Sequence, residues 1–287
     1  MSYVTKPADP VAAAGRPPLA KMPALKPRTV VIPGGGTTDY LVIPSRFCGP
    51  PGSGNGGYVC GRIAAYLPGP VTVTLRRPPP LATTMTVERD GERSVRVHHG
   101  LTLIAEATSS PDRPAPRIPG PVGAADARTA AGRARYYTDP LFPDCFVCGP
   151  GRRPGDGVRI FPGPVTGQPL WAAPWTPDLS VADADGRVRP EMVWAALDCP
   201  SGIAVGEAAG LPRDTAILLG QMTASLATPP TAGDQCLVMA WPEGRDGRKL
   251  TAGSALLGPD GQVLAAASAV WLTVPRPVPA LAAQTAS

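Results

Sequence analysis

Two stretches of the chain have the apolar pattern of a buried helix, and each is followed by shorter apolar runs. The first is 55–67, which is apolar nearly all round and carries small residues at Gly57, Cys60, Gly61 and Ala64. A helix without a polar face is covered on several sides, so we predict a buried helix with close neighbours. The second is 190–199, where Pro190 suits a first helical turn and Pro200 is predicted to end the helix.

The shorter apolar runs predict β-strands, because they are separated by turn residues such as Asp90-Gly91. Around the first helix we predict strands at 40–44, 71–75, 85–88, 94–97 and 101–107. Around the second we predict strands at 158–161, 170–175, 215–226, 235–241, 250–257 and 263–274. A helix with an antiparallel set of strands, occurring twice, predicts an α+β protein rather than alternating βαβ units.

The repeated order of helix and strands indicates an internal duplication. In both units a predicted strand is followed by a turn that ends in two prolines, which we call the proline corner. Its sequence is Leu75-Arg76-Arg77-Pro78-Pro79 in the first unit and Leu226-Ala227-Thr228-Pro229-Pro230 in the second. We predict a first domain at 37–118 and a second at 144–275. The remaining segments are a flexible N-terminal tail at 1–36, a connector at 119–143 with a helix near 124–137, and a flexible C-terminal tail at 276–287.

Composition narrows the class of protein. Proline and glycine, 39 and 33 of 287 residues, are about a quarter of the chain, but they punctuate apolar runs, and 43% hydrophobic residues suffice for a core. The net charge is +5, and the charged residues are scattered without a basic block interleaved with aromatics, so we predict no nucleic-acid partner.

The sequence also bears on location. No stretch reaches transmembrane length, and the N-terminus lacks the apolar core of a signal peptide, so we predict neither membrane association nor export. The six cysteines do not have the spacing of a disulfide framework. The expected location is a reducing cytoplasm.

Several short motifs, taken in order, resemble a known family. They are Gly54-Asn55-Gly56-Gly57-Tyr58, Arg76-Arg77-Pro78, Cys145-Phe146-Val147-Cys148-Gly149, Gly157-Val158-Arg159-Ile160, Trp194-Ala195-Ala196-Leu197-Asp198 and Ala266-Ala267-Ser268-Ala269-Val270-Trp271. Over roughly 40–275 this order resembles the double-hotdog acyl-CoA thioesterases, which include the bacterial type II acyl-CoA thioesterases. The resemblance implies a tandem hotdog fold, in which each curved antiparallel sheet wraps a central helix, and hydrolysis of acyl-CoA or acyl-carrier-protein thioesters.

Asp198 is the leading catalytic candidate. It lies late in an otherwise apolar predicted helix, where a carboxylate must be paired, neutral or directed into a pocket. Thioester hydrolysis needs such a carboxylate as nucleophile or as base for water, and the resemblance implies that this helix supplies it. A carboxylate bonded to backbone near the helix end is the alternative. Glu191, two turns earlier on nearly the same face, is a weaker candidate because acids favour a first helical turn.

Gln221 and Thr223 are the predicted partners of Asp198. They alternate on the strand predicted at 215–226, so both are expected to point inward and hold water against Asp198. The resemblance implies the hydroxyl role for Thr223, although threonine is also a common strand residue. The family's last-strand glutamine corresponds here to Ala269. A non-hydrolytic acyl-thioester-binding or biosynthetic protein therefore stays an alternative.

The start of the first helix is the predicted substrate-binding region. Asn55 is a good N-cap, and the backbone N–H groups of Gly56 and Gly57 suit an oxyanion or a phosphate. Tyr58 is a candidate donor through its hydroxyl, although packing is the commoner role.

Trp194 and Arg76 complete the predicted substrate contacts. Trp194 belongs to the motif that carries Asp198. Arg76 lies in the first proline corner, where it suits the phosphates of coenzyme A or a carrier protein, although a solvated surface charge is the commoner role of such a residue. A homodimer is also expected, because exposed sheet edges invite pairing.

The sequence predicts no metal site and no cofactor. Cys145 and Cys148 form one pair, but a structural zinc site needs four ligands, and no second cysteine pair or spaced histidine pair follows. Cys199 and Cys236 could join only through space. The two histidines, His98 and His99, follow a predicted strand outside both helices. Hydratase-type chemistry, which pairs a histidine with an acid on the pocket helix, is therefore not expected.

Overall fold

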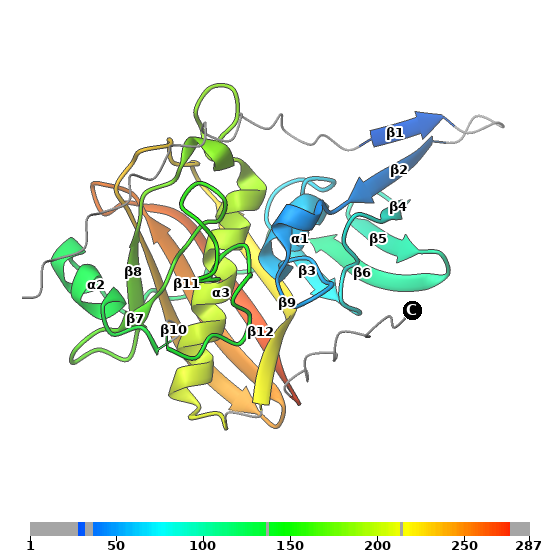
Figure 1. Ribbon diagram of the computed structural model, residues 1–287. Helices are drawn as coiled ribbons and strands as arrows, with labels where there is room; N and C mark the ends of the chain where they lie inside the picture. Colours follow the sequence, from blue (N-terminus) through cyan, green and yellow to red (C-terminus); the bar gives the residue numbers. More distant parts are fainter. Residues whose placement is uncertain (1–27, 32–36, 136–137, 213–214, 276–287) are drawn as a thin grey trace, which may run out of the picture.

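The computed structural model describes residues 28–31, 37–135, 138–212 and 215–275 (Figure 1). Its strands form a 12-stranded sheet in the order β1-β2-β4-β5-β6-β3-β9-β12-β11-β10-β8-β7. Every pair of neighbouring strands is antiparallel. The predicted α+β class, with antiparallel strands, is thereby observed.

The sheet has two halves that meet at one strand pair. The first half consists of β1 (Arg28–Val31), β2 (Thr37–Val42), β3 (Val71–Leu75), β4 (Thr84–Asp90), β5 (Ser94–His99) and β6 (Thr102–Ser109). The second consists of β7 (Gly163–Pro164), β8 (Trp171–Trp175), β9 (Thr215–Leu226), β10 (Cys236–Asp246), β11 (Lys249–Leu257) and β12 (Val263–Pro275). Strands β3 and β9 join the halves, with Val71 opposite Ala224 and Thr74 opposite Gln221.

Two helices lie against the sheet and pack on each other. Helix α1 (Gly56–Ala64) belongs to the first half and α3 (Pro190–Ala208) to the second, and α3 crosses the strands of its half (Figure 1). Helix α2 (Ala124–Ala131) packs against β8 at the outer edge. The 3-10 turns are η1 (Ser45–Phe47) and η3 (Leu179–Val181). One buried apolar cluster contains residues of both halves. The division into two domains stays a prediction.

Three predicted elements differ in the structure. Helix α3 does not end at Pro200 but continues to Ala208, because its buried apolar residues pack on the sheet and offset the proline's cost of about 3 kcal/mol. The segment 158–161 is buried but forms no strand, since Arg159 has a positive φ of 58°. Arg28–Val31, predicted as tail, forms β1 against β2.

Two other elements differ at one end, since β10 continues past the predicted end at 241 to Asp246 and α2 ends at Ala131 rather than near 137. The predicted C-terminal tail, and 1–27 and 32–36 of the predicted N-terminal tail, lie outside the described residues. Among the described helices, none has the length and apolar character needed to span a membrane.

Candidate functional site

Two glycines let α1 and α3 touch. A Cβ added at Gly57 would lie 2.4 Å from the Cβ of Asp198 and 2.6 Å from the carbonyl oxygen of Trp194. A Cβ at Gly61, one turn later, would lie 2.6 Å from the Cα of Glu191. Carbon atoms in normal contact are about 3.5–4.0 Å apart, so only glycine permits this approach. Two of the small residues predicted on the first helix, Gly57 and Gly61, therefore face the second helix.

The contact brings Asp198 to the first turn of α1. Its Oδ2 accepts hydrogen bonds from the Gly57 N–H at 2.8 Å and from Asn55 Nδ2 at 3.0 Å. Asn55 is also the N-cap, because its Oδ1 accepts from the Tyr58 N–H at 2.9 Å. The second carboxylate oxygen, Oδ1, is buried and has no hydrogen-bond partner among the described residues. A buried acceptor without a partner is costly, so Oδ1 is the carboxylate oxygen that a hydrogen bond from a bound water or substrate would satisfy.

The surroundings adjust the acidity of Asp198. The side chain is 2% exposed, and burial raises the pKa of its carboxyl from 3.8 to about 7, with the nearby Cys145 adding to the rise. The hydrogen bonds from Gly57 and Asn55 act in the opposite direction, because they favour the charged form. A carboxyl with a pKa near neutrality is suited to take up and return a proton.

A pocket of about 350 Å³ borders this carboxylate. One wall is the start of α1 with Asn55 and Gly56, and another is the proline corner with Arg76 and Arg77. The sheet side is apolar and includes Leu219 and Trp271. The pocket thus joins the candidate acid, a helix N-terminus and two arginines.

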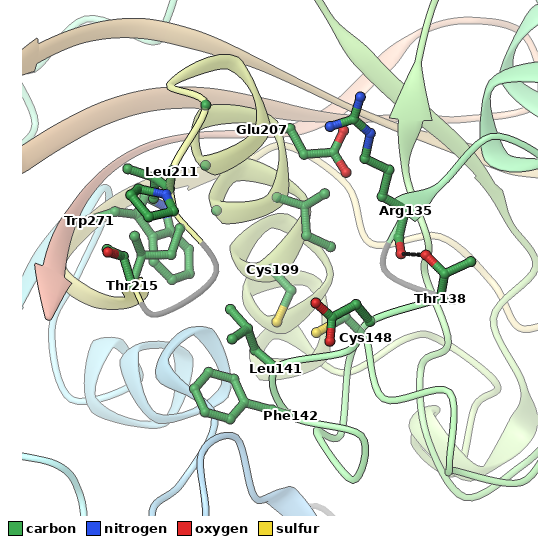
Figure 2. A pocket seen from close by; sticks show the side chains of 17 residues that line it. Arg135, Thr138, Leu141, Phe142, Cys148, Cys199, Glu207, Leu211, Thr215 and Trp271 are labelled. Atoms are coloured by element: carbon green, nitrogen blue, oxygen red, sulfur yellow. Dashed lines mark hydrogen bonds between the residues drawn. The ribbon is translucent and has the colours of Figure 1, made fainter. Parts of the chain in front are cut away.

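A second cavity of about 550 Å³, whose lining side chains are drawn in Figure 2, adjoins the first. The two share the lining residues Phe142, Cys148, Cys199, Ile217 and Trp271. The larger cavity runs along α3 and has apolar walls that include Ile203 and Leu211. Its volume lies within the usual range for small-molecule sites of about 300–1,000 Å³.

Thr223 and Gln221 do not lie beside Asp198, which corrects the sequence prediction. Thr223 shares a 2.8 Å hydrogen bond with Thr72, and Gln221 Nε2 donates to Thr74 at 2.9 Å. Neither residue lines the pocket beside Asp198.

The reason is a β-bulge in β9. Val270 of β12 pairs with Gln221 of β9, and the next residue, Trp271, pairs with Leu219. Gly220, between the two β9 residues, is therefore an extra residue. The bulge reverses the alternation, so that Leu219 faces α1 while Gln221 is turned away. Simple alternation places Gln221 inward, and one inserted residue moves it to the other face.

Two predicted substrate contacts are also corrected. Tyr58 is fully buried, its ring stacks on Phe47 at 3.9 Å, and it does not line the pocket. Trp194 is 3% exposed and packs its Cβ toward Gly61 in the helix interface. Arg76 does line the pocket, where it also forms an ion pair with Glu106.

Sequence reasoning missed the apolar wall formed by Leu219 and Trp271. It considered a cluster of thiols but did not predict one. Cys199, next to Asp198, has its sulfur 3.7 Å from that of Cys145. The Cys-Phe-Val-Cys stretch was a visible signal, but the third cysteine comes from a segment 54 residues away.

The architecture matches solved structures of low sequence identity. A tesB protein from Mycobacterium avium subsp. paratuberculosis is 12% identical, with a TM-score of 0.56 over 83% of this chain and 93% of that one. A protein assigned as thioesterase II from Thermobifida fusca is 14% identical, with a TM-score of 0.55 over 86% and 95%. A protein assigned as a thioesterase from Novosphingobium aromaticivorans is 14% identical, with a TM-score of 0.51 over 82% and 94%.

The chain has a hotdog-type α+β fold. The resemblance to type II acyl-CoA thioesterases is confirmed at the level of fold. No protein-family model and no curated protein sequence matches the chain. Since fold narrows the substrate class better than the reaction, the function depends on the site itself.

Proposed function

We propose that this protein hydrolyses acyl thioesters of coenzyme A or acyl-carrier protein, with Asp198 as the base that activates water. The observation that carries the proposal is the Asp198 carboxylate, which has one oxygen held by Gly57 and Asn55 and the other without a partner at the pocket. The tesB and thioesterase II structures of the same fold support the substrate class. We also propose that the halves joined at β3 and β9 are two hotdog units.

The proposed reaction uses Asp198 twice. Its Oδ1 takes a proton from a water molecule, whose oxygen attacks the thioester carbonyl carbon. The resulting tetrahedral oxyanion is stabilised by the N–H of Gly56, which lines the pocket at the start of α1, where the helix dipole favours negative charge. When the intermediate collapses, the carbon–sulfur bond breaks, and the proton held by Asp198 passes to the leaving thiolate. The products are a carboxylic acid and a free thiol.

The two cavities suit the two parts of such a substrate. The larger one, with walls that include Ile203 and Leu211, would accept the acyl chain. Arg76 and Arg77, at the other end of the smaller pocket, would contact phosphates of coenzyme A or the carrier. The thioester would then lie between them, at Asp198. The predicted homodimer remains untested.

Thiol release from a panel of acyl-CoAs of increasing chain length tests the proposal. We expect the Asp198→Asn variant to lose on the order of 10²–10⁴-fold in kcat, the usual contribution of a general base, while titration calorimetry shows retained acyl-CoA binding. The control is Glu191→Gln, because Glu191 is a carboxylate on the same helix that does not line the pocket. It should keep its turnover.

The outcomes separate the candidate functions. Binding without turnover in the native protein would contradict hydrolysis and identify a non-hydrolytic acyl-thioester binder. Equal loss in both variants would mean that Asp198 acts only through folding. Neither binding nor turnover with any acyl-CoA or acyl-carrier protein would refute the assignment of substrate class.

A further inference from the structure

The segment 145–149 folds into a tight turn around the sulfur of Cys145. The Gly149 N–H donates to the carbonyl of Cys145 at 2.9 Å, and a Cβ at Gly149 would lie 2.4 Å from that oxygen. The turn therefore fixes the backbone that carries Cys145 and Cys148.

Helix α3 brings a third sulfur to this turn. The sulfur atoms of Cys145, Cys148 and Cys199 all lie within 4.8 Å of one another, and among the described residues no other histidine, cysteine or acidic group meets this criterion. The Cys145–Cys199 separation is 3.7 Å. Tetrahedral zinc with Zn–S bonds of about 2.3 Å requires sulfurs about 3.8 Å apart. The spacing of these two sulfurs therefore already suits one tetrahedral ion.

The immediate surroundings also supply a hydrogen-bond donor to the sulfurs. Asn55 Nδ2 is directed at two of the sulfurs, 3.5 Å from Cys199 and 3.9 Å from Cys145. Amide donors of this kind orient ligands from outside the coordination shell.

We propose that Cys145, Cys148 and Cys199 bind one zinc ion through three sulfurs, with the fourth coordination position open to the cavities. Three thiols give up three protons as the ion binds, so the thiolate–zinc complex carries a charge of −1. Cys148 and Cys199 line both cavities, and Figure 2 shows their sulfur atoms side by side there. Three protein ligands with one open position are typical of zinc sites that accept water or a substrate atom.

This inference goes beyond the proposed hydrolysis and does not depend on it. The sequence predicts no metal site because Cys145 and Cys148 supply only two ligands. The packing of α3 against the turn supplies the third. The ion would bind whether or not Asp198 activates water.

Metal uptake by the full-length reduced protein tests the proposal. Protein incubated with zinc and freed of excess on a gel-filtration column should retain one ion per chain by elemental analysis. Cobalt(II) as a second probe should give a thiolate-to-cobalt charge-transfer band and the visible bands of tetrahedral coordination. Cys148→Ser and Cys199→Ser should each weaken zinc binding at least about tenfold, a loss that even outer-shell changes can produce.

Cys236→Ser is the matched control, because Cys236 is buried in β10 outside the cluster. It should retain zinc and the cobalt spectrum. Native reduced protein that takes up neither ion would overturn the proposal, as would undiminished binding in both cluster variants. A Cys145–Cys199 disulfide in protein prepared without reductant, with no metal uptake after reduction, would also overturn it. If the variants fail to fold, the cobalt spectrum of the native protein still decides.

Discussion

Replacing Gly57 by alanine tests whether the close approach of α1 and α3 holds the candidate site together. The added methyl would lie 2.4 Å from the Asp198 Cβ and 2.6 Å from the Trp194 carbonyl oxygen. To restore carbon contacts of about 3.5 Å, the helices must separate by about 1 Å. One obstacle is helix backbone rather than the end of a flexible side chain, so the strain cannot be relieved by a rotamer change.

The magnitude follows from two opposing effects. Overpacking a well-packed interface costs about 1–3 kcal/mol, and a backbone obstacle favours the upper end. Alanine in a helix contributes about 0.5–1 kcal/mol relative to glycine. We therefore expect Gly57→Ala to lower the free energy of unfolding by about 2 kcal/mol. It should also lower thioester turnover, since separation lengthens the bond from the Gly57 N–H to Asp198.

Gly206→Ala is the matched control, because Gly206 also lies inside a helix but its added Cβ would be 3.4 Å from its nearest neighbour, the flexible Ile217 Cδ1. This variant should be as stable as the native protein or more so. Urea denaturation followed by tryptophan fluorescence measures both variants. An unfolding free energy of Gly57→Ala equal to that of the native protein would refute the argument that only glycine fits there.

Two further substitutions test the electrostatics and the geometry of the site. Because burial raises the Asp198 pKa from 3.8 to about 7, the neutral carboxyl contributes stability that is fully present below pH 3.8 and lost as the pH rises to about 7. The free energy of unfolding of Asp198→Asn should therefore rise relative to that of the native protein over this pH range, by up to about 4 kcal/mol above pH 7. Urea denaturation at several pH values, in chelator and reductant, measures this difference. A difference that does not change with pH would contradict the raised pKa. Thr223→Val should leave kcat unchanged in the thiol-release assay, because Thr223 forms a hydrogen bond with Thr72 and does not line the pocket. A large loss of kcat would show that Thr223 reaches the substrate.

Much of the fold could be predicted because its elements follow local periodicity. The strand at Thr215–Leu226 and the helix starting at Pro190 appear where the apolar pattern placed them. The failures come from long-range packing. Pro200 is accommodated because α3 is buried against the sheet, and the buried run at 158–161 is kept from pairing by the conformation of Arg159. Neither effect is visible in a short window of sequence.

The candidate site divides in the same way. Asp198 could be identified from the sequence because a charged residue in an apolar helix must be paired, neutral or directed into a pocket. Asn55 and Gly57 could be identified because the N-terminus of a helix offers hydrogen-bond donors. The bulge at Gly220 could not be foreseen, and it places Gln221 and Thr223 on the opposite face from Leu219, where they bond to β3. Register, unlike periodicity, is set by the whole sheet.

Asn55 connects the two chemistries of this region. Its Nδ2 lies 3.0 Å from Asp198 Oδ2, 3.5 Å from the Cys199 sulfur and 3.9 Å from the Cys145 sulfur. An amide nitrogen has two N–H donors, so it cannot serve three acceptors fully at once. Whichever acceptor carries more negative charge attracts the amide more strongly, because hydrogen bonds to charged acceptors are roughly twice as strong as neutral ones. The carboxylate and the thiols therefore compete for one amide group, and a gain of negative charge at either weakens the hold on the other.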